Sequence, residues 1–425
     1  MLELRRLRND REAVAAGLAK RGLDMAQVDA VIDLDDRRKA EQADLDEHQR
    51  AVNDLSREIG ARIKAGDRAG GEALKAEVAA AKAAIATLKD QHDATQAALR
   101  EALYLLPNVP HASVPDGRSP DDNEVVRAPP AALPVLPQGA LPHWDLGERY
   151  GLFDLPAGVR LTGAGFIVYR GRGARLQRAL VNFFLDRAAE AGYAEVQVPH
   201  LVNEDSARGT GQLPDKEGQM YYVPADELYL IPTAEVPITN LLRGEIVAAA
   251  ELPIKYAGYT PCFRREAGSY GAHVRGLNRV HQFDKVEIVR VESPADSYAA
   301  LEEMVAHVGG LLGALGLPYR VLRLCGGDMG LTAALTYDFE VWSAAQERWL
   351  EVSSVSNFET YQSNRLGLRV RDGKRKRLAH TLNGSALALP RVVAALLENN
   401  QTPDGITIPE ALRPYTGFDR IEAPA

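Results

Sequence analysis

The sequence predicts an α+β fold, in which an antiparallel sheet flanked by helices follows an N-terminal antiparallel α-helical coiled-coil arm. Three observations support this. Apolar residues repeat every seven positions in the first hundred residues, prolines accumulate directly after them, and beyond the prolines helix and strand patterns alternate. The chain of 425 residues is long enough for two or three domains with a large core.

The arm is predicted from two heptad runs, one from about residue 29 to 64 and one after Gly71. The remaining positions hold mostly Ala, Glu, Lys, Gln and Arg, which are good helix formers. We expect two helices of roughly 50 Å each, joined by a turn over residues 65–71. The apolar repeat consists of Val31, Leu45, Val52 and Ile59 with Leu34 and Leu55, then Leu74, Ala81 and Leu88 with Val78, Ile85 and Leu99.

Four polar residues interrupt this seam, and we expect them to set register rather than bind a ligand: Arg38, Glu41, His48 and His92. A heptad hairpin fits two roles, a dimerisation rod or a projecting arm that grips an extended partner. The repeat alone leaves both open.

Proline-rich segments follow, over residues 106–110 and 128–142, and predict an extended linker. Beyond them we expect helices over residues 173–191 and 297–315 and strands over 194–198 and 286–291. The strand pair 256–260 and 280–291 lies too close in sequence for a crossover helix, which indicates an antiparallel sheet.

Composition narrows the class of protein. The first residues are charged and no apolar run reaches membrane-spanning length, so neither a signal peptide nor a membrane span is expected. The two cysteines, Cys262 and Cys325, lie far apart, which argues against a disulfide framework or a cysteine-rich zinc site and fits a reducing cytoplasm. The formal net charge of −8 disfavours nonspecific nucleic-acid binding but permits RNA binding through a local basic face.

Several nucleotide and metal motifs are missing from the sequence. It contains neither a P-loop, nor a complete G-x-G-x-x-G, nor HExxH, nor a Cys/His cluster. If the protein uses ATP, side chains and metal must therefore hold the phosphates.

The densest chemical stretch runs from Cys262 to Glu287 and holds arginines, a lysine, two glutamates and an aromatic ring around a glycine-containing loop. Guanidinium groups suit phosphates and a ring suits a base, so a nucleotide site is predicted there. The alternative is a solvated, salt-bridged hairpin. The residues concerned are Arg264, Arg265, Arg275, Arg279, Lys285, Glu266, Glu287 and Phe283, with Gly268, Gly271 and Gly276 in the loop.

Two further segments are candidates for the site. The strands predicted over 336–342 and 349–354 are rich in carboxylates, and Glu351 and Ser354 offer hard oxygen ligands to Mg²⁺ bound with ATP, although ordinary strand polarity explains them as well. Residues 383–391 couple a small-residue turn to a helix that starts at Arg391.

These stretches together resemble a known family. Phe263 to Glu287 is similar to motif 2 of class II aminoacyl-tRNA synthetases in its seryl form, residues 383–391 to motif 3, and 192–199 to motif 1 with its final proline. Thr233-Ala-Glu235 matches the seryl T-x-E loop, and Gly209-Thr-Gly-Gln-Leu-Pro214 also matches. The resemblance covers nearly the whole chain in order. One departure is Ala272-His-Val274 at the motif 2 loop tip, which puts acceptor-end contacts there in doubt.

The resemblance, to bacterial-type seryl-tRNA synthetases, implies a tRNA-binding domain over 1–105 with the coiled coil, a Pro-rich linker over 106–145 and a class II catalytic domain over 146–425. It implies an ATP-dependent serine–tRNA ligase that forms seryl-adenylate and charges tRNA(Ser), and also tRNA(Sec). It further implies a cytoplasmic homodimer that needs ATP and Mg²⁺ and no zinc, and that does not bind membranes.

The resemblance also assigns roles to residues. The catalytic residues are Arg264, Glu287 and Arg391. Serine is bound by Thr233, Ala234, Glu235, Arg264, Glu287, Asn383 and Ser385. ATP is bound by Arg264, Arg265, Glu266, Val280, Phe283, Glu351, Val352, Ser353, Ser354 and Arg391, and Glu351 and Ser354 also hold Mg²⁺.

Two other functions remain open at this point. One is a ligase that loads an amino acid onto a carrier protein, against which the long arm and the lone cysteines count. The other is a noncatalytic RNA-binding paralogue, against which the charged residues at Arg264, Glu266, Glu287, Glu351 and Arg391 count.

Overall fold

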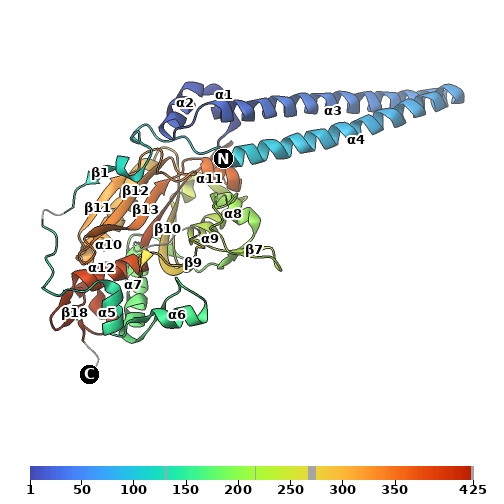
Figure 1. Ribbon diagram of the computed structural model, residues 1–425. Helices are drawn as coiled ribbons and strands as arrows, with labels where there is room; N and C mark the ends of the chain where they lie inside the picture. The colour runs from blue at the N-terminus through green and yellow to red at the C-terminus, as the bar shows by residue number, and fades with distance from the viewer. Residues whose placement is uncertain (130–131, 216, 267–273, 423–425) are drawn as a thin grey trace. The chain divides into compact units, whose positions relative to one another are not determined.

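The computed structural model describes residues 1–129, 132–215, 217–266 and 274–422. They form two compact units (Figure 1). The helical unit comprises Leu2–Ala16 and Leu23–Pro107, and the catalytic unit comprises Met1, Gly17–Gly22 and Asn108–Ala425. The sequence placed the end of the arm at residue 105, two residues before the helical unit ends.

The helical unit is the predicted arm. Its helices are α1 (Leu4–Asn9), the first part of α2 (Arg11–Lys20), α3 (Ala26–Lys64) and α4 (Arg68–Leu105). Helices α3 and α4 run side by side along their length (Figure 1). The turn is shorter than expected, because α4 starts at Arg68, where the Asp67 carboxylate caps it by accepting from the Gly70 amide at 2.9 Å.

The seam between the two helices follows the heptads, with Val31, Val52 and Leu99 buried. One expected seam residue, His48, is exposed instead. Glu41 does lie at the seam and accepts a hydrogen bond from the Thr95 hydroxyl on the other helix at 3.0 Å, as a register-setting contact would.

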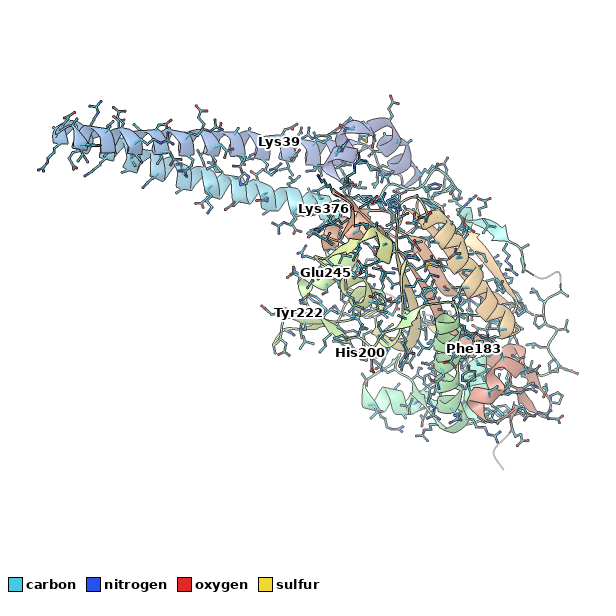
Figure 2. All side chains as sticks on the ribbon, turned by 180° about the vertical axis from the view of Figure 1, so that it is seen from behind. Lys39, Phe183, His200, Tyr222, Glu245 and Lys376 are labelled. Atoms are coloured by element: carbon cyan, nitrogen blue, oxygen red, sulfur yellow. The ribbon has the colours of Figure 1, made fainter. Side chains whose placement is uncertain are left out.

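The base of the arm carries a buried charge that the sequence did not reveal. Asp35 is 1% exposed and pairs with Arg8 on α1 at 2.6 Å and with Lys39 at 2.7 Å, the latter labelled in Figure 2. Burial opposes ionisation, but hydrogen bonds from Lys39, Arg38 and Arg8 prevail and lower the pKa of Asp35 to about 2. The ion pair with Arg8 therefore ties α1 to α3.

The catalytic unit is built on an eight-stranded sheet in the order β1-β11-β12-β13-β16-β10-β9-β4. All neighbouring strands are antiparallel except β4 and β9, which confirms the predicted antiparallel sheet. The strands are β1 (Glu124–Arg127), β4 (Ala194–Glu195), β9 (Ile254–Phe263), β10 (Gln282–Glu292), β11 (Tyr319–Arg323), β12 (Leu335–Ser343), β13 (Arg348–Asn357) and β16 (His380–Ala388).

Three long helices cover one face of this sheet: α7 (Gly171–Glu190), α10 (Ser297–Ala314) and α12 (Leu389–Asn399) (Figure 1). They bury the main core, in which Phe183 of α7, labelled in Figure 2, is 1% exposed. Side chains alternate along β10, so Val286 and Ile288 join that core. Their neighbours Lys285 and Glu287 therefore face the other side of the sheet.

Shorter elements complete the catalytic unit. Small sheets are formed by β2 (Phe153–Asp154) with β3 (Val168–Tyr169), by β5 (Leu201–Val202), β6 (Tyr222–Val223) and β7 (Leu228–Leu230), by β8 (Ile246–Ala248), β14 (Arg369–Asp372) and β15 (Arg375–Leu378), and by β17 (Gln401–Thr402), β18 (Gly405–Thr407) and β19 (Arg420–Ile421). The short helices are α5 (His143–Arg149), α6 (Leu155–Leu161), α8 (Glu204–Thr210), α9 (Glu235–Asn240), α11 (Tyr361–Leu366) and α13 (Arg413–Thr416), with 3-10 turns over Pro120–Asp122, Ala249–Glu251 and Glu410–Leu412.

The proline-rich segments 106–110 and 128–142 hold no helix within the described residues; edge strand β1 (Glu124–Arg127) lies between them, and α5 begins at His143. One local expectation was wrong. The small residues after Asn383 form strand β16 rather than a turn, since they pair with β10 and β13, and Arg391 follows in the first turn of α12. Small side chains in β16 allow that close pairing, as where Gly384 opposes Val355.

Within the described residues, no helix is long and apolar enough to cross a membrane. Both cysteines are buried free thiols.

Candidate functional site

The predicted serine-binding residues converge on the sheet face opposite the three long helices. Glu287 lies on β10 and Ser385 beside it on β16, because these two residues are register partners. Thr233 precedes α9 and approaches from the other side of Glu287, with its hydroxyl 3.5 Å from the Glu287 carboxylate. Three segments far apart in sequence thus meet around one carboxylate.

The centre of this group is a buried lysine–glutamate pair. Lys285 is 5% and Glu287 2% exposed, and their charged groups are in direct contact. The Lys285 ammonium also donates to the hydroxyls of Thr233 at 2.8 Å and Ser385 at 3.2 Å. Hydroxyl groups and a counter-ion thus satisfy the buried charges.

A second carboxylate, Glu235, lies close by and is harder to ionise. Burial, followed by the negative charge of Glu287, raises the pKa of Glu235 to about 7. Gln362 of α11 partly offsets this by donating to the Glu235 carboxylate at 2.7 Å. The Thr381 hydroxyl donates to the Gln362 carbonyl at 2.8 Å and so fixes which end of the amide faces Glu235.

The remaining residues assigned to serine lie around this pair. Ala234 is fully buried and packs with Ile238 beneath the segment. Asn383 is 6% exposed; its side-chain amide lies near the Glu235 carboxylate and lowers the pKa of that group, although its nitrogen makes no hydrogen bond of good geometry within the described parts of the chain. A buried amide donor of this kind is costly unless a ligand accepts from it.

Arg264 and Phe283 form the next part of the site. Arg264 follows the end of β9, and its guanidinium donates to the Pro232 carbonyl at 3.4 Å, next to Thr233. The same guanidinium lies over the Phe283 ring, with its carbon 5.3 Å from the ring centre. An arginine held between an aromatic ring and the T-x-E segment can contact both a nucleotide and an amino acid.

Arg265, Glu266 and Val280 lie along the two stems of the motif 2 hairpin. Arg265 is exposed, and its amide donates to the Gln219 carbonyl at 2.8 Å. Glu266 forms an ion pair with Arg279 on the opposite stem, and Val280 is buried. The loop-tip residues Gly268, Gly271, Ala272 and His273 lie outside the described residues.

Arg391 is held at two points. Its Nε donates to the Asn278 carbonyl and its Nη1 to the Glu351 carbonyl, at 2.8 and 2.7 Å. Burial lowers its pKa from the ordinary value, with smaller contributions from other charged groups that include Arg264. Two arginines thus approach the same region, Arg264 from the end of β9 and Arg391 from the first turn of α12, as a polyphosphate requires.

The residues predicted to hold Mg²⁺ suit a hard cation. Glu351 is an exposed carboxylate on β13, and the Ser354 hydroxyl lies 3.5 Å from it. Opposite Ser354 on β12 is Asp338, whose Oδ1 is buried and lacks a partner within the described residues. Burial and the charge of Glu351 raise the pKa of Asp338 well above its ordinary value, and a bound cation would reverse that effect. Between them, Val352 and Ser353 bury their side chains, and the Ser353 hydroxyl donates to the Ser385 backbone carbonyl at 2.6 Å.

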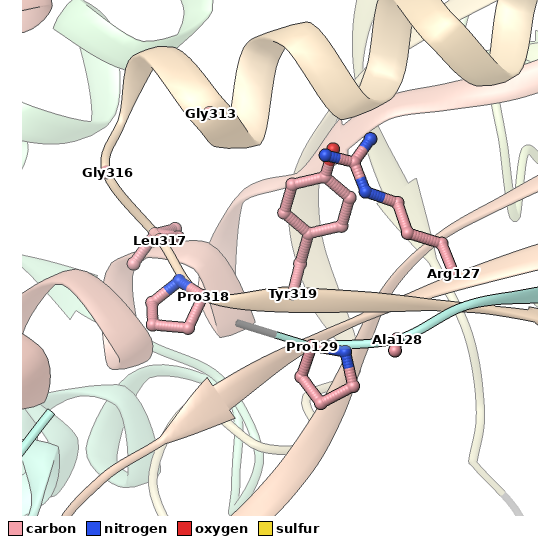
Figure 3. Close-up of a pocket in the computed structure, with 8 residues that line it drawn as sticks. All are labelled: Arg127, Ala128, Pro129, Gly313, Gly316, Leu317, Pro318 and Tyr319. Carbon is pink, nitrogen blue, oxygen red and sulfur yellow. The ribbon is translucent and has the colours of Figure 1, made fainter. Parts of the chain in front are cut away.

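A separate cavity of about 380 Å³ lies at the other edge of the sheet, by β1 and β11. It is lined by residues 127–129, Gly313 and residues 316–319 (Figure 3), and the Arg127 guanidinium lies 4.5 Å from the centre of the Tyr319 ring. None of its lining residues was assigned to the site.

Sequence reasoning missed three residues of the site. Lys285 was noted as part of a charged run, although its position two residues before Glu287 in a strand places both on one face. Asp338 was visible in the carboxylate-rich strand. Gln362 carried no signal, because its partner Glu235 lies 127 residues away.

The chain is similar to known proteins over its whole length. Residues 1–110 match the model of the seryl-tRNA synthetase N-terminal domain, and residues 222–400 match that of the tRNA synthetase class II core domain (G, H, P, S and T). Serine–tRNA ligases of Salinibacter ruber and Chlorobaculum parvum are 52% and 47% identical, over 100% and 99% of this chain and 100% of each relative.

Solved structures give the same result. The seryl-tRNA synthetase of Pyrococcus horikoshii, solved with ATP, superposes with a TM-score of 0.91 at 33% identity over 100% of both chains. The cytoplasmic serine–tRNA ligase of Naegleria fowleri, solved with AMP, gives 0.86 at 27% identity, over 100% of this chain and 99% of the other.

Proposed function

This chain belongs to the seryl-tRNA synthetases, and we propose how the residues of its site divide the work of a class II serine–tRNA ligase. The enzyme activates L-serine with ATP to seryl-adenylate and transfers the seryl group to tRNA(Ser). In the first step the serine carboxylate attacks the α-phosphorus and pyrophosphate leaves. In the second, a ribose hydroxyl of the terminal adenosine attacks the seryl carbonyl and AMP leaves.

The amino-acid end of the site is the group around Glu287. When Glu235 is ionised, Glu287 and Glu235 provide two carboxylates against the single ammonium of Lys285, so one net negative charge is left for the ammonium of serine. The serine hydroxyl then faces Thr233, Ser385 and the amide of Asn383. A site that bonds a hydroxyl strongly rejects alanine, because its own polar groups would otherwise stay unpaired.

The nucleotide end is carried by the two arginines. Arg264 neutralises the α-phosphate and the attacking carboxylate together, and Arg391 binds the terminal phosphate of ATP. Phe283 packs against adenine, with Glu266 and the Val280 backbone near the base and Arg265 by the phosphates. Activation of this kind depends mainly on positioning and charge neutralisation, which fixed guanidinium groups provide.

Glu351 and Ser354, with Asp338 beside them, would hold Mg²⁺ bound with ATP, where the cation neutralises phosphate charge. The donors are all hard oxygens, and the buried, unpartnered oxygen of Asp338 supports this assignment. The protein's own part is to place these oxygens next to Arg391, whose guanidinium nitrogen lies 3.8 Å from the Glu351 carboxylate.

The finer partners are also proposals. The helical unit binds tRNA along α3 and α4, and tRNA(Sec) shares that surface with tRNA(Ser). Two chains form a homodimer through the motif 1 element at α7 and β4, and the protein acts in the cytoplasm.

The observation that carries this assignment is the convergence of Glu287, Glu235 and Lys285 with Arg264 on one sheet face. ATP–pyrophosphate exchange, measured with each amino acid in turn, tests the assignment. We expect serine to be the only efficient substrate and alanine to be strongly rejected. Efficient exchange with another amino acid would overturn the serine assignment. Transfer of serine to a carrier protein would favour the carrier ligase, and absence of exchange the noncatalytic paralogue.

A further inference from the structure

A buried polar cluster outside the site centres on Glu398 near the end of α12. Glu398 and His143, the first residue of α5, are both 0% exposed. One carboxylate oxygen of Glu398 accepts from His143 twice, from Nδ1 at 2.7 Å and from the backbone amide at 3.0 Å. Ser343 donates to the other oxygen, and Gln346 to the first at 3.0 Å. This buried carboxylate therefore receives donors from two segments far apart in sequence, the start of α5 and the turn at the end of β12.

The hydrogen bonds fix the form of the histidine. The backbone amide of Leu277 donates to the His143 Nε2 at 2.9 Å, so that nitrogen must carry a lone pair. The ring proton is then on Nδ1, where it points at Glu398. Burial alone would raise the pKa of Glu398, but hydrogen bonds from His143 and Ser343 hold it below the ordinary value, which keeps the acceptor charged.

Leu277 and Asn278 connect this cluster to the nucleotide site. They form the second stem of the motif 2 hairpin, which packs closely on α5: a Cβ at Gly276 would lie 2.4 Å from the His143 Nε2. The Asn278 side chain donates to the Gln346 carbonyl at 2.8 Å, while its backbone carbonyl accepts from the Arg391 guanidinium at 2.8 Å. A continuous chain of hydrogen bonds thus runs from Glu398 to Arg391.

We propose that His143 and Glu398 are positioning residues for ATP, which hold the backbone of Leu277 and Asn278 so that the Asn278 carbonyl sets the orientation of Arg391. The idea rests on the proposed role of Arg391 in binding ATP. A guanidinium that must meet a phosphate within a few tenths of an ångström needs such a supporting shell. The rival explanation is that the cluster only anchors α5 to α12.

Gln401 provides a matched control for the alternative that the cluster only anchors α5 to α12. Its side chain also ties the segment before α5 to the end of α12, since it accepts from the Leu141 amide at 2.8 Å and donates to the Leu141 carbonyl at 2.9 Å. It also donates to the Glu398 backbone carbonyl at 2.9 Å, but within the described residues it makes no hydrogen bond to the Glu398 carboxylate, Leu277, Asn278 or Gln346. Gln401→Ala should lower the melting temperature and leave the KM for ATP unchanged.

The test uses pairs of variants in the full-length enzyme. His143→Asn keeps a donor for Glu398 but loses the acceptor for Leu277, whereas His143→Gln extends an acceptor towards Leu277. In pyrophosphate exchange, His143→Asn should raise the KM for ATP about tenfold, as expected for one lost hydrogen bond, with the KM for serine unchanged. His143→Gln should recover part of that loss. Gln346→Met, at a half-buried position, removes the Asn278 tie and gives a second measurement if His143→Asn does not fold.

Each change is then combined with Arg391→Ala. If His143 acts through Arg391, the ATP effect of His143→Asn should vanish in the Arg391→Ala background, because interacting sites are not additive. Two results would overturn the proposal. One is an equal change in the KM for ATP in the wild-type and Arg391→Ala backgrounds; the other is a KM for ATP that rises in Gln401→Ala together with the loss of melting temperature. If Arg391→Ala itself leaves the KM for ATP unchanged, the proposed role of Arg391 fails instead.

Discussion

The affinity for serine should depend on pH through Glu235. Its pKa is raised to about 7, because it is buried and because Glu287 is close. Below pH 7 the carboxyl is therefore mostly protonated and cannot bind the serine ammonium as an anion. Between pH 8 and pH 6 the ionised fraction falls about tenfold, so the KM for serine should rise about tenfold over the same range.

Gln362 allows this explanation to be tested without touching serine directly. Its amide donates to the ionised form of Glu235, so Gln362→Met should raise the Glu235 pKa further and move the rise in KM to higher pH. The pH profile should therefore report Glu235.

The assay is serine-dependent pyrophosphate exchange at saturating ATP from pH 6 to 9, with calorimetry at pH 6 in two buffers of different ionisation enthalpy. Serine binding at pH 6 should release about one proton, since the ammonium displaces it from Glu235. Thr402→Val, which removes a hydroxyl remote from the site, should show the wild-type profile. A KM for serine that is flat from pH 6 to 8, with no proton release, would refute the reasoning.

Three further predictions concern the arm and the nucleotide site. Deleting residues 29–103 should leave pyrophosphate exchange largely intact and abolish tRNA charging; loss of exchange in a folded, dimeric deletion variant would place the arm in the active site. Arg264→Ala should lose about 3 kcal/mol of transition-state stabilisation and Arg264→Lys should recover little of it, because a point charge cannot bridge phosphate and carboxylate; near-normal exchange by the lysine variant would contradict this. Changing Lys64 and Arg68 at the arm tip to alanine should weaken tRNA binding and flatten its log–log salt dependence by about one to two, with the KM for serine and ATP unchanged; an unchanged slope would point to the basic run 374–377.

The choice of Lys64 and Arg68 comes from the structure. The basic residues near the turn of the arm also include Arg57, Arg62 and Lys75. These three instead pair with Asp54, Glu58 and Glu72 on their own helices, at 3.1, 2.6 and 2.5 Å. Exposed ion pairs of this kind contribute little to stability, so a phosphate can replace the carboxylate. The carboxylate must be displaced first, however, which weakens the attraction between these residues and RNA.

Regular spacing explains which parts of the fold could be predicted. Heptads predicted α3 and α4, and the two-residue alternation of a strand places Glu287 opposite Val286, away from the core. The same rule would have found Lys285. It failed at the segment after Asn383, where small residues were taken for a turn, because a strand paired on both sides can use small side chains for close packing.

Contacts between distant segments could not be predicted in this way, and they make up the supporting parts of the site. Gln362 reaches Glu235 from α11 only because α11 packs beside β16 and α8, a placement that the spacing of residues does not encode. His143 shows the same limit more strongly. Its neighbours include Pro137 and Pro142, whose fixed backbone angles predict an extended spacer, and that prediction is correct as far as local physics goes. The residues of an extended segment do not determine where in the fold the segment ends, so the packing partner of the residue that follows it cannot be predicted from them. Here it ends against α12, where a buried glutamate needs a neutral donor with an acceptor on its far side, and histidine is the side chain that offers both.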